Sequence, residues 1–175
     1  IRAGLFRLYF DYQEEREKNE LISTSLIGFG LLTLAVVLLC IRFNVSFSRI
    51  VFGTPEFARF FTIVFVSLWL NMIIECAVSY LMVRQLSTAY TVLSLMRLVI
   101  ALLLNVYFLV VRHMGVAGLL WSGLITAAIF STGLSFYMSA RVGIRFCWPK
   151  YKALLFFGLP LIPADLGRFV LTFSD

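Results

Sequence analysis

The chain has 175 residues, of which 61% are hydrophobic and only 14% are charged. An average soluble domain is about 45–50% apolar and about 25% charged, so this composition argues against a soluble globular domain. The formal net charge of +6 does not indicate nucleic-acid binding, because the basic residues collect in short segments between long apolar runs.

Residues 1–20 change character along their length. Aromatic and aliphatic side chains dominate the first half, and the charged run QEEREKNE closes the second. We expect the first part to continue a preceding helix out of a bilayer and the second part to be a solvated loop. The chain begins at Ile1 rather than at a methionine, and we expect it to be an internal piece of a longer, transporter-sized protein.

Four apolar runs are each long enough to cross a bilayer, for which a helix needs roughly 20 residues. We predict spans over residues 21–41, 55–83, 88–111 and 115–140, and a fifth candidate over 153–173. None of them shows the short alternating pattern of a β-barrel strand. The sequence therefore predicts an all-α, polytopic helical membrane protein.

The second span has a typical helix start in TPEFARFF. Thr54 suits the N-cap, Pro55 suits the first helical position, and Glu56 complements the helix dipole. A helix over 55–83 would be about 43 Å long, so we expect it to tilt or to project from the bilayer.

Each span reverses the side of the membrane, which allows the basic residues of the two sides to be compared. Nine lie in segments 1–20, 84–87 and 141–152, and four lie on the opposite side. The positive-inside rule then places residues 1–20 and 141–152 in the cytoplasm. We expect the protein to lie in the cytoplasmic membrane.

The fourth span carries two lines of small side chains. They are Gly123, Ala127, Ser131, Ser135 and Ser139, and beside them Gly118, Ser122 and Thr126. Such lines let helix backbones approach closely in lipid. We favour static packing over a sliding surface between moving helices.

Residues 141–157 are predicted to form an amphipathic connection at the membrane surface. One face would carry Trp148, Tyr151, Leu154 and Leu155. Pro160 and Pro163 follow within the fifth candidate span, where they predict a kink or a break. Either a broken helix at a substrate site or a bent helix start would explain them.

Arg97 lies in VLSLMRLVIALLL and has no charged residue for 12 positions before it or 14 after it. A charge near the bilayer centre costs about 2.5–3.5 kcal/mol, so it needs a partner or a wet cavity. Glu75, in the preceding span, is the candidate partner. If the two helices form a hairpin centred near Leu86, both charges lie about 16 Å from the turn.

Polar residues near these charges form two stripes. The earlier span carries Ser67, Asn71, Glu75 and Ser79, and the later one carries Tyr90, Ser94, Arg97, Ala101 and Asn105. The hairpin also places Asn71 opposite Ala101, and Ser67 opposite Asn105. Two interpretations stay open: an ion pair that fixes packing, or a hydrated cavity in which Arg97 attracts an anionic substrate and Glu75 sets its charge or takes a proton.

Metal and catalytic sites are not expected. Cys40, Cys76 and Cys147 are widely separated, and His113 is the only histidine. No phosphate-binding loop, hydrolase elbow or zinc-protease motif occurs. We therefore predict no enzyme, no catalytic residue and no metal ligand.

Three stretches resemble polysaccharide biosynthesis proteins of the oligosaccharide (O-antigen type) flippase family. They are FRLYFDYQEEREKNELISTSL (6–26), GVAGLLWSGLI (115–125) and FGLPLIPADLGRFVLTFSD (157–175). This family is part of the multidrug-oligosaccharidyl-lipid-polysaccharide flippase superfamily. The resemblance implies two lobes of six or more helices, with helices three to six in 1–140, the inter-lobe connection in 141–157 and the start of helix seven in 158–175.

The resemblance implies a transporter that flips polyprenyl-pyrophosphate-linked oligosaccharide across the membrane by alternating access. The candidate cavity residues are Arg97, Glu75, Asn71, Arg84, Asn105 and Arg168. Glu75 and Asp165 are candidates for coupling to H⁺ or Na⁺, and no other cofactor is expected. The expected partners are the lipid-linked oligosaccharide, membrane lipids and other glycan-assembly proteins, with no nucleic acid.

Four rival functions remain. The nearest are a cation-coupled multidrug exporter, against which Arg97 argues, and a lipid II flippase of the same superfamily. A membrane enzyme of glycan assembly would need a large outer loop, whereas the longest one here is 42–59. A non-transporting scaffold would have little reason to place Glu75 and Arg97 inside its spans.

Overall fold

The computed structural model describes residues 5, 8–10, 12, 14–143 and 145–158, and over these residues the chain contains no strand. Its helices are α2 (Glu15–Arg42), α3 (Asn44–Phe52), α4 (Ala58–Val83), α5 (Ser87–Val106), the short π-helix η1 (Tyr107–Val111), α6 (Gly115–Val142) and α7 (Trp148–Gly158). Among the described residues, four helices, counting α5 and η1 as one, are long and apolar enough to cross a membrane. The predicted all-α, polytopic helical fold is confirmed.

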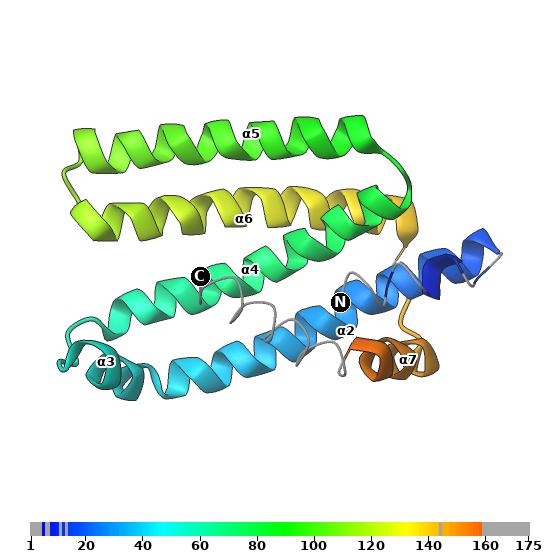
Figure 1. Ribbon diagram of the computed structural model, residues 1–175, viewed down its shortest axis with the longest axis horizontal. Coiled ribbons are helices and arrows are strands. Elements are labelled where there is room, and N and C mark those ends of the chain that lie inside the picture. Colours follow the sequence, from blue (N-terminus) through cyan, green and yellow to red (C-terminus); the bar gives the residue numbers. More distant parts are fainter. Residues whose placement is uncertain (1–4, 6–7, 11, 13, 144, 159–175) are drawn as a thin grey trace, which may run out of the picture.

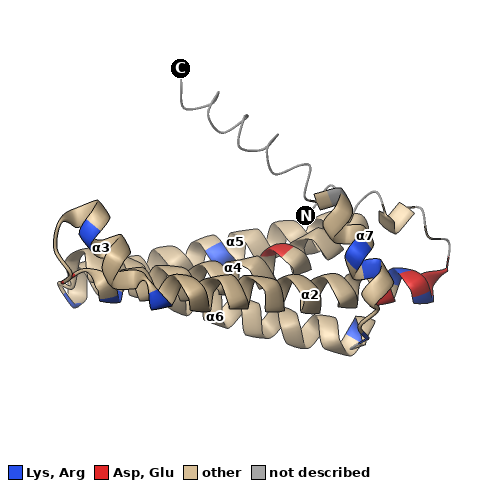
Figure 2. Cartoon of the chain, turned by 90° about the horizontal axis from the view of Figure 1, so that it is seen from below, with Lys and Arg blue, Asp and Glu red and all other residues tan. Residues whose placement is uncertain are grey.

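The four long helices lie side by side and alternate in direction (Figure 1). α4 makes its most extensive contacts with α6 and α2, and α5 packs mainly on α6. We name the two ends of the bundle by their short helices. The α7 end holds the start of α2 and the α4–α5 turn, and the α3 end holds the α5–α6 turn. Most of the charged residues lie toward these two ends, and a few lie within the long helices (Figure 2).

The outward face of α5 shows what surrounds the bundle. Seven of its apolar side chains are more than half exposed: Leu95, Met96, Leu98, Val99, Leu102, Leu103 and Val106. Water-soluble proteins rarely expose a continuous apolar surface of this kind, whereas lipid tails solvate it. The chain is therefore a multi-pass membrane protein.

Most of the predicted spans coincide with observed helices. The spans predicted over 21–41, 88–111 and 115–140 each fall within one helical stretch that extends a little beyond them. The span predicted over 55–83 ends where α4 ends, but its predicted start is wrong, because α4 begins at Ala58.

The short helix α3 explains the later start of α4. α3 ends at Gly53, whose φ of 74° is a left-handed conformation that glycine adopts readily. Ser48 Oγ then donates a hydrogen bond to the Thr54 carbonyl oxygen at 2.6 Å. Thr54 therefore closes the end of α3, and residues 54–57 form a turn before α4.

The amphipathic connection predicted over 141–157 divides between two helices. α6 continues to Val142, and α7 places Tyr151 and Leu154 in buried positions beside α2, while Trp148 stays exposed. Pro160, Pro163 and most of the fifth candidate span lie outside the described residues.

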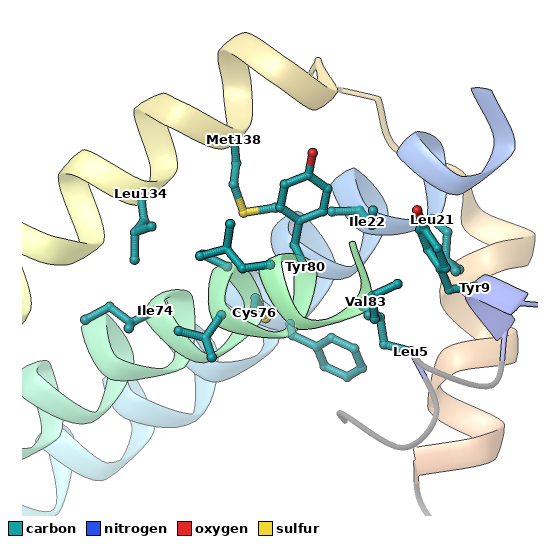
Figure 3. Close-up of a cluster of buried hydrophobic side chains, with 14 of the residues drawn as sticks. Leu5, Tyr9, Leu21, Ile22, Ile74, Cys76, Tyr80, Val83, Leu134 and Met138 are labelled. Carbon is teal, nitrogen blue, oxygen red and sulfur yellow. The ribbon is translucent and has the colours of Figure 1, made fainter. Parts of the chain in front are cut away.

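Much of the buried apolar core lies at the α7 end of the bundle. Side chains from α2, α4 and α6 meet there with residues that precede α2. This cluster includes Leu5, Tyr9, Leu21, Ile22, Ile74, Cys76, Tyr80, Val83, Leu134 and Met138 (Figure 3). α5 contributes no fully buried residue. The helices α2, α4 and α6 thus share the buried core of the bundle.

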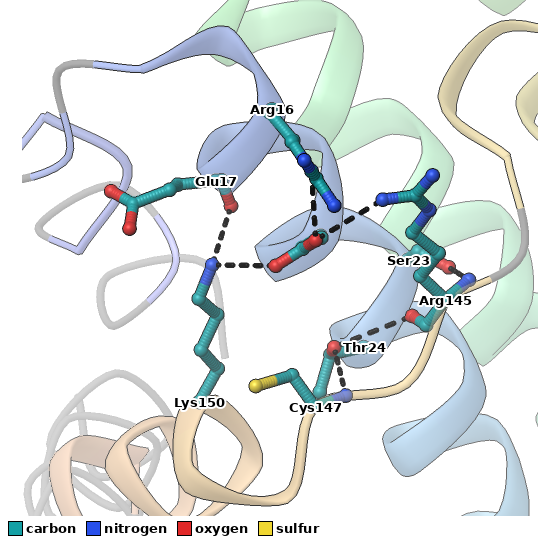
Figure 4. A network of polar contacts seen from close by, with 8 residues as sticks. Arg16, Glu17, Ser23, Thr24, Arg145, Cys147 and Lys150 are labelled. Atoms are coloured by element: carbon teal, nitrogen blue, oxygen red, sulfur yellow. Dashed lines mark hydrogen bonds and ion pairs between the residues drawn. The ribbon is translucent and has the colours of Figure 1, made fainter.

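The segment between α6 and α7 is held against α2 by two buried hydroxyl side chains. Ser23 Oγ accepts a hydrogen bond from Arg145 N at 2.8 Å, and Thr24 Oγ1 accepts one from Cys147 N at 3.0 Å (Figure 4). Thr24 Oγ1 also donates to the Arg145 carbonyl oxygen at 3.5 Å. Because buried backbone groups must find partners, these side chains let an irregular segment lie on an apolar helix.

Gly28 makes room for α7 on the surface of α2. The Tyr151 hydroxyl donates to the Gly28 carbonyl oxygen at 3.3 Å. Burial raises the pKa of the Tyr151 phenol, so this group stays protonated and able to donate. A Cβ at Gly28 would overlap the Tyr151 ring, whereas a Cβ at Gly30 would meet open space.

We predict that Gly28→Ala destabilises the protein by about 1–3 kcal/mol, the usual cost of overpacking. Gly30→Ala is the matched control, and it should be neutral or stabilise α2 by up to about 1 kcal/mol through helix propensity. Thermal unfolding in detergent and limited proteolysis between α6 and α7 measure the two variants. Equal unfolding temperatures and equal cleavage would contradict the packing of Tyr151 on Gly28.

Candidate functional site

The predicted site residues fall into three groups. Glu75 and Asn71 lie on α4, and Arg97 and Asn105 lie on α5, all within the spans. Arg84 directly follows α4 at the α7 end. The two remaining candidates, Asp165 and Arg168, lie outside the described residues.

The polar stripe predicted on α5 faces the bundle. Its five members are half-buried, whereas the apolar residues between them on the helix surface are mostly exposed. The stripe consists of Tyr90, Ser94, Arg97, Ala101 and Asn105. One side of α5 therefore meets the neighbouring helices, and the other side is exposed.

Arg97 is held by an amide on α4. Its Nη2 atom donates to Asn71 Oδ1, and Asn71 Nδ2 donates to the Ser67 carbonyl oxygen at 2.8 Å. The bond to Ser67 uses the nitrogen of the Asn71 amide and turns its oxygen toward the arginine. Two residues of the predicted α4 stripe therefore orient the guanidinium.

Glu75 lies one helical turn from the residue that Arg97 bonds. Among the described residues, no ion pair joins Glu75 to Arg97, and the Glu75 side chain is exposed. The turn is centred on Gln85 rather than Leu86, with Gln85 in a left-handed conformation. Arg97 is then level with Ile73, between the two polar residues, and it bonds Asn71.

Asn105 contacts α6 rather than the predicted Ser67. The Ser122 hydroxyl donates to Asn105 Oδ1 and lies 2.8 Å from the Leu119 carbonyl oxygen. Ser122 is fully buried, as are Gly118 and Thr126 in the same line of small residues. The sequence indicated this line as a packing face, and the polar role of Ser122 within it was not predicted.

Arg84 does not belong to the same site as Arg97. Its Nη2 atom lies 2.9 Å from Glu15 Oε2 and 3.1 Å from Asn19 Oδ1, and its guanidinium stacks 5.7 Å from the Tyr80 ring centre. These contacts tie the end of α4 to the start of α2. About 18 Å of helix separates Arg84 from the level of Arg97.

An apolar groove of about 470 Å³ lies beside the helix that carries Arg97. It lies between α4, α5 and α6 in the half of the bundle nearer the α7 end, and its lining includes Leu81, Leu93, Met96, Ile100, Phe130 and Leu134. Met96 precedes Arg97 and Ile100 lies about one turn after it. Arg97 itself does not line the groove, which runs along a neighbouring side of the same helix.

This arrangement suits an anion that carries a hydrocarbon chain. A guanidinium binds phosphate through two parallel hydrogen bonds, and a neutral amide orients it without cancelling its charge. Within the described part of the chain, no three His, Cys, Asp or Glu side chains gather closely enough to hold a metal ion.

Water access to the inner face of α5 can be measured with single cysteines in a variant without Cys40, Cys76 and Cys147. We predict that Ser94→Cys reacts with a membrane-impermeant maleimide, because it shares the inward face with Arg97. Val99→Cys, the matched control on the lipid face, should not react. Equal labelling at the two positions would contradict a hydrated interior beside Arg97.

Comparisons of the chain with models of protein families, with curated proteins and with solved structures find no match.

Proposed function

We propose that this chain is part of a membrane transporter that flips polyprenyl-pyrophosphate-linked oligosaccharide across the cytoplasmic membrane for surface polysaccharide synthesis. The observation that carries the proposal is Arg97, a cation inside a span, turned toward the bundle and held by the neutral amide of Asn71. The resemblance of three sequence segments to oligosaccharide flippases supports it.

Energetics favour a functional role for Arg97. Placing an arginine at the centre of a span costs about 2.5–3.5 kcal/mol. A hydrogen bond between helices in a membrane returns only about 0.6 kcal/mol on average, and 1–2 kcal/mol in model peptides. Packing alone would therefore be served better by an apolar residue, whereas an anionic substrate would recover the cost on binding.

The substrate class follows from two features of α5, the cation Arg97 and the apolar groove on the same helix. A pyrophosphate is a strong acceptor for the guanidinium, and a polyprenyl chain is apolar, as is the groove that Met96 and Ile100 help to line. A cationic drug would be repelled by Arg97, which disfavours the multidrug exporter. A lipid II flippase would use the same chemistry. It is distinguished from the proposed oligosaccharide flippase by the glycan that the cell exports.

The orientation follows from the basic residues of the two ends. The described part of the α7 end carries Arg16, Lys18, Arg84, Arg141, Arg145, Lys150 and Lys152, and the α3 end carries Arg42, Arg49, Arg59 and Arg112. The positive-inside rule counts Lys and Arg and gives Asp and Glu little weight. We therefore assign the α7 end, with residues 1–20 and 141–152, to the cytoplasm.

In the proposed transporter, two lobes rock about a central cavity and expose it to each side in turn. Residues 1–140 belong to the first lobe, 141–157 connect the lobes, and 158–175 begin the second. Glu75 and Asp165 remain the candidates for coupling to H⁺ or Na⁺. Other glycan-assembly proteins are the proposed partners.

We predict that Arg97→Ala in the full-length protein abolishes export of surface glycan, because the pyrophosphate loses its cationic partner. Arg97→Lys should retain part of the export, since a point charge remains without the paired donors. Surface glycan is measured in a strain that lacks its own flippase, and membrane insertion is checked by protease protection. Full export by an inserted Arg97→Ala variant would refute the proposal, and increased drug resistance would favour the multidrug exporter.

A second variant tests whether the charge of Arg97 must stay available. Asn71→Asp places a carboxylate against the guanidinium, so we expect export to fall at least tenfold while the protein folds normally, with an ion pair in place of the hydrogen bond. Asn44→Asp, at the α3 end, is the matched control. If Asn71→Asp exported as well as the control, Arg97 would have only a packing role.

A further inference from the structure

A second basic site lies at the α7 end, away from Arg97. A pocket of about 540 Å³ opens between the start of α2, the end of α6 and the segment that leads to α7. It is lined by Arg16, Asn19, Glu20, Val142, Gly143 and Arg145. No role was predicted for it from the sequence.

Three cations surround one carboxylate at this pocket. Arg16 Nε and Arg145 Nη1 lie 3.6 Å and 3.4 Å from Glu20 Oε1, and Lys150 Nζ lies 3.2 Å from Glu20 Oε2 (Figure 4). We name these four residues the Glu20 cluster. One carboxylate cannot neutralise three cations, so the cluster has a net charge of +2.

The two arginines keep donors available. The side chains of Arg16 and Arg145 are 75% and 57% exposed, and each guanidinium has five N–H groups. Arg145 holds the connection to α2 through its backbone, so its side chain is not needed for that contact. Lys150 is 11% exposed and also donates to the Glu17 carbonyl oxygen at 3.2 Å, which makes it a structural member of the cluster.

The pocket lies at the depth of lipid headgroups. The uncharged run of α2 begins at Leu21, directly after Glu20, and the uncharged run of α6 ends directly before Arg141. Aromatic rings of Phe146, Trp148 and Tyr151 pack together beside it, as side chains do at a membrane surface. A phosphate in this plane is within reach of the pocket from the membrane.

We propose that this pocket binds a phosphate group at the membrane surface, with Arg16 and Arg145 as its ligands and Glu20 as a competitor that holds them in place. The phosphate belongs either to an anionic lipid headgroup or to a phosphate compound in water. The site is separate from Arg97, and it does not depend on the proposed transport activity.

Binding is measured on the full-length protein in nanodiscs of phosphatidylcholine. One arm adds a fluorescent phosphatidylglycerol and follows its enrichment around the protein, and the other adds inorganic pyrophosphate to the water phase. A double variant, Arg16→Gln with Arg145→Gln, should reduce binding roughly thirtyfold, since each basic residue near an anionic headgroup contributes about fivefold. Arg49→Gln with Arg112→Gln, at the α3 end, is the matched control.

Glu20→Gln gives an effect of the opposite sign. It removes the competing carboxylate, so phosphate binding should increase several-fold even if α7 is held less firmly, which thermal unfolding reports separately. Enrichment of phosphatidylglycerol alone assigns the phosphate to lipid, and pyrophosphate binding alone assigns it to a soluble compound. Unchanged binding in the double arginine variant, or no increase with Glu20→Gln, would overturn the proposal.

Discussion

The free-energy cost of a polar group in hydrocarbon governs this bundle. On α5 it separates the side chains into an apolar face toward lipid and a polar face toward the other helices. Many hydroxyl groups in the spans return to carbonyl oxygens of their own helix, as Thr33, Ser79 and Thr126 do. Arg97 and Ser122 also bond residues of neighbouring helices, and these two contacts join α5 to α4 and to α6.

The spans could be predicted from the sequence because the thickness of a bilayer imposes the length of each apolar run. The inward face of α5 could also be predicted, since a polar stripe on an apolar helix has to turn away from lipid. Both features depend on one helix and its solvent. They require no knowledge of which helices are neighbours.

The features that were missed depend on contacts between distant residues or on a shift of one position. The observed start of α4 is later than the predicted one because α3 and Gly53 precede it, and a helical α3 was not predicted. A turn centred one residue earlier placed Arg97 nearer to Asn71 than the assumed symmetry allowed. The docking of α7 joins Ser23 and Thr24 to residues more than 120 positions away, and no local pattern reveals such a pairing.

The distribution of contacts along α5 indicates how the proposed transporter would open. Near the α3 end, α5 is held by Asn105 on Ser122, and η1 packs Phe108 closely on Gly118. Toward the α7 end, an apolar groove lies between α5, α4 and α6, and Tyr90 and Leu93 pack partly against the core, although no residue of α5 is fully buried. A helix with few buried contacts moves more readily than the core it leans on. In the proposed transporter, α5 would therefore move at its α7 end together with the turn at residues 84–86 that joins it to α4.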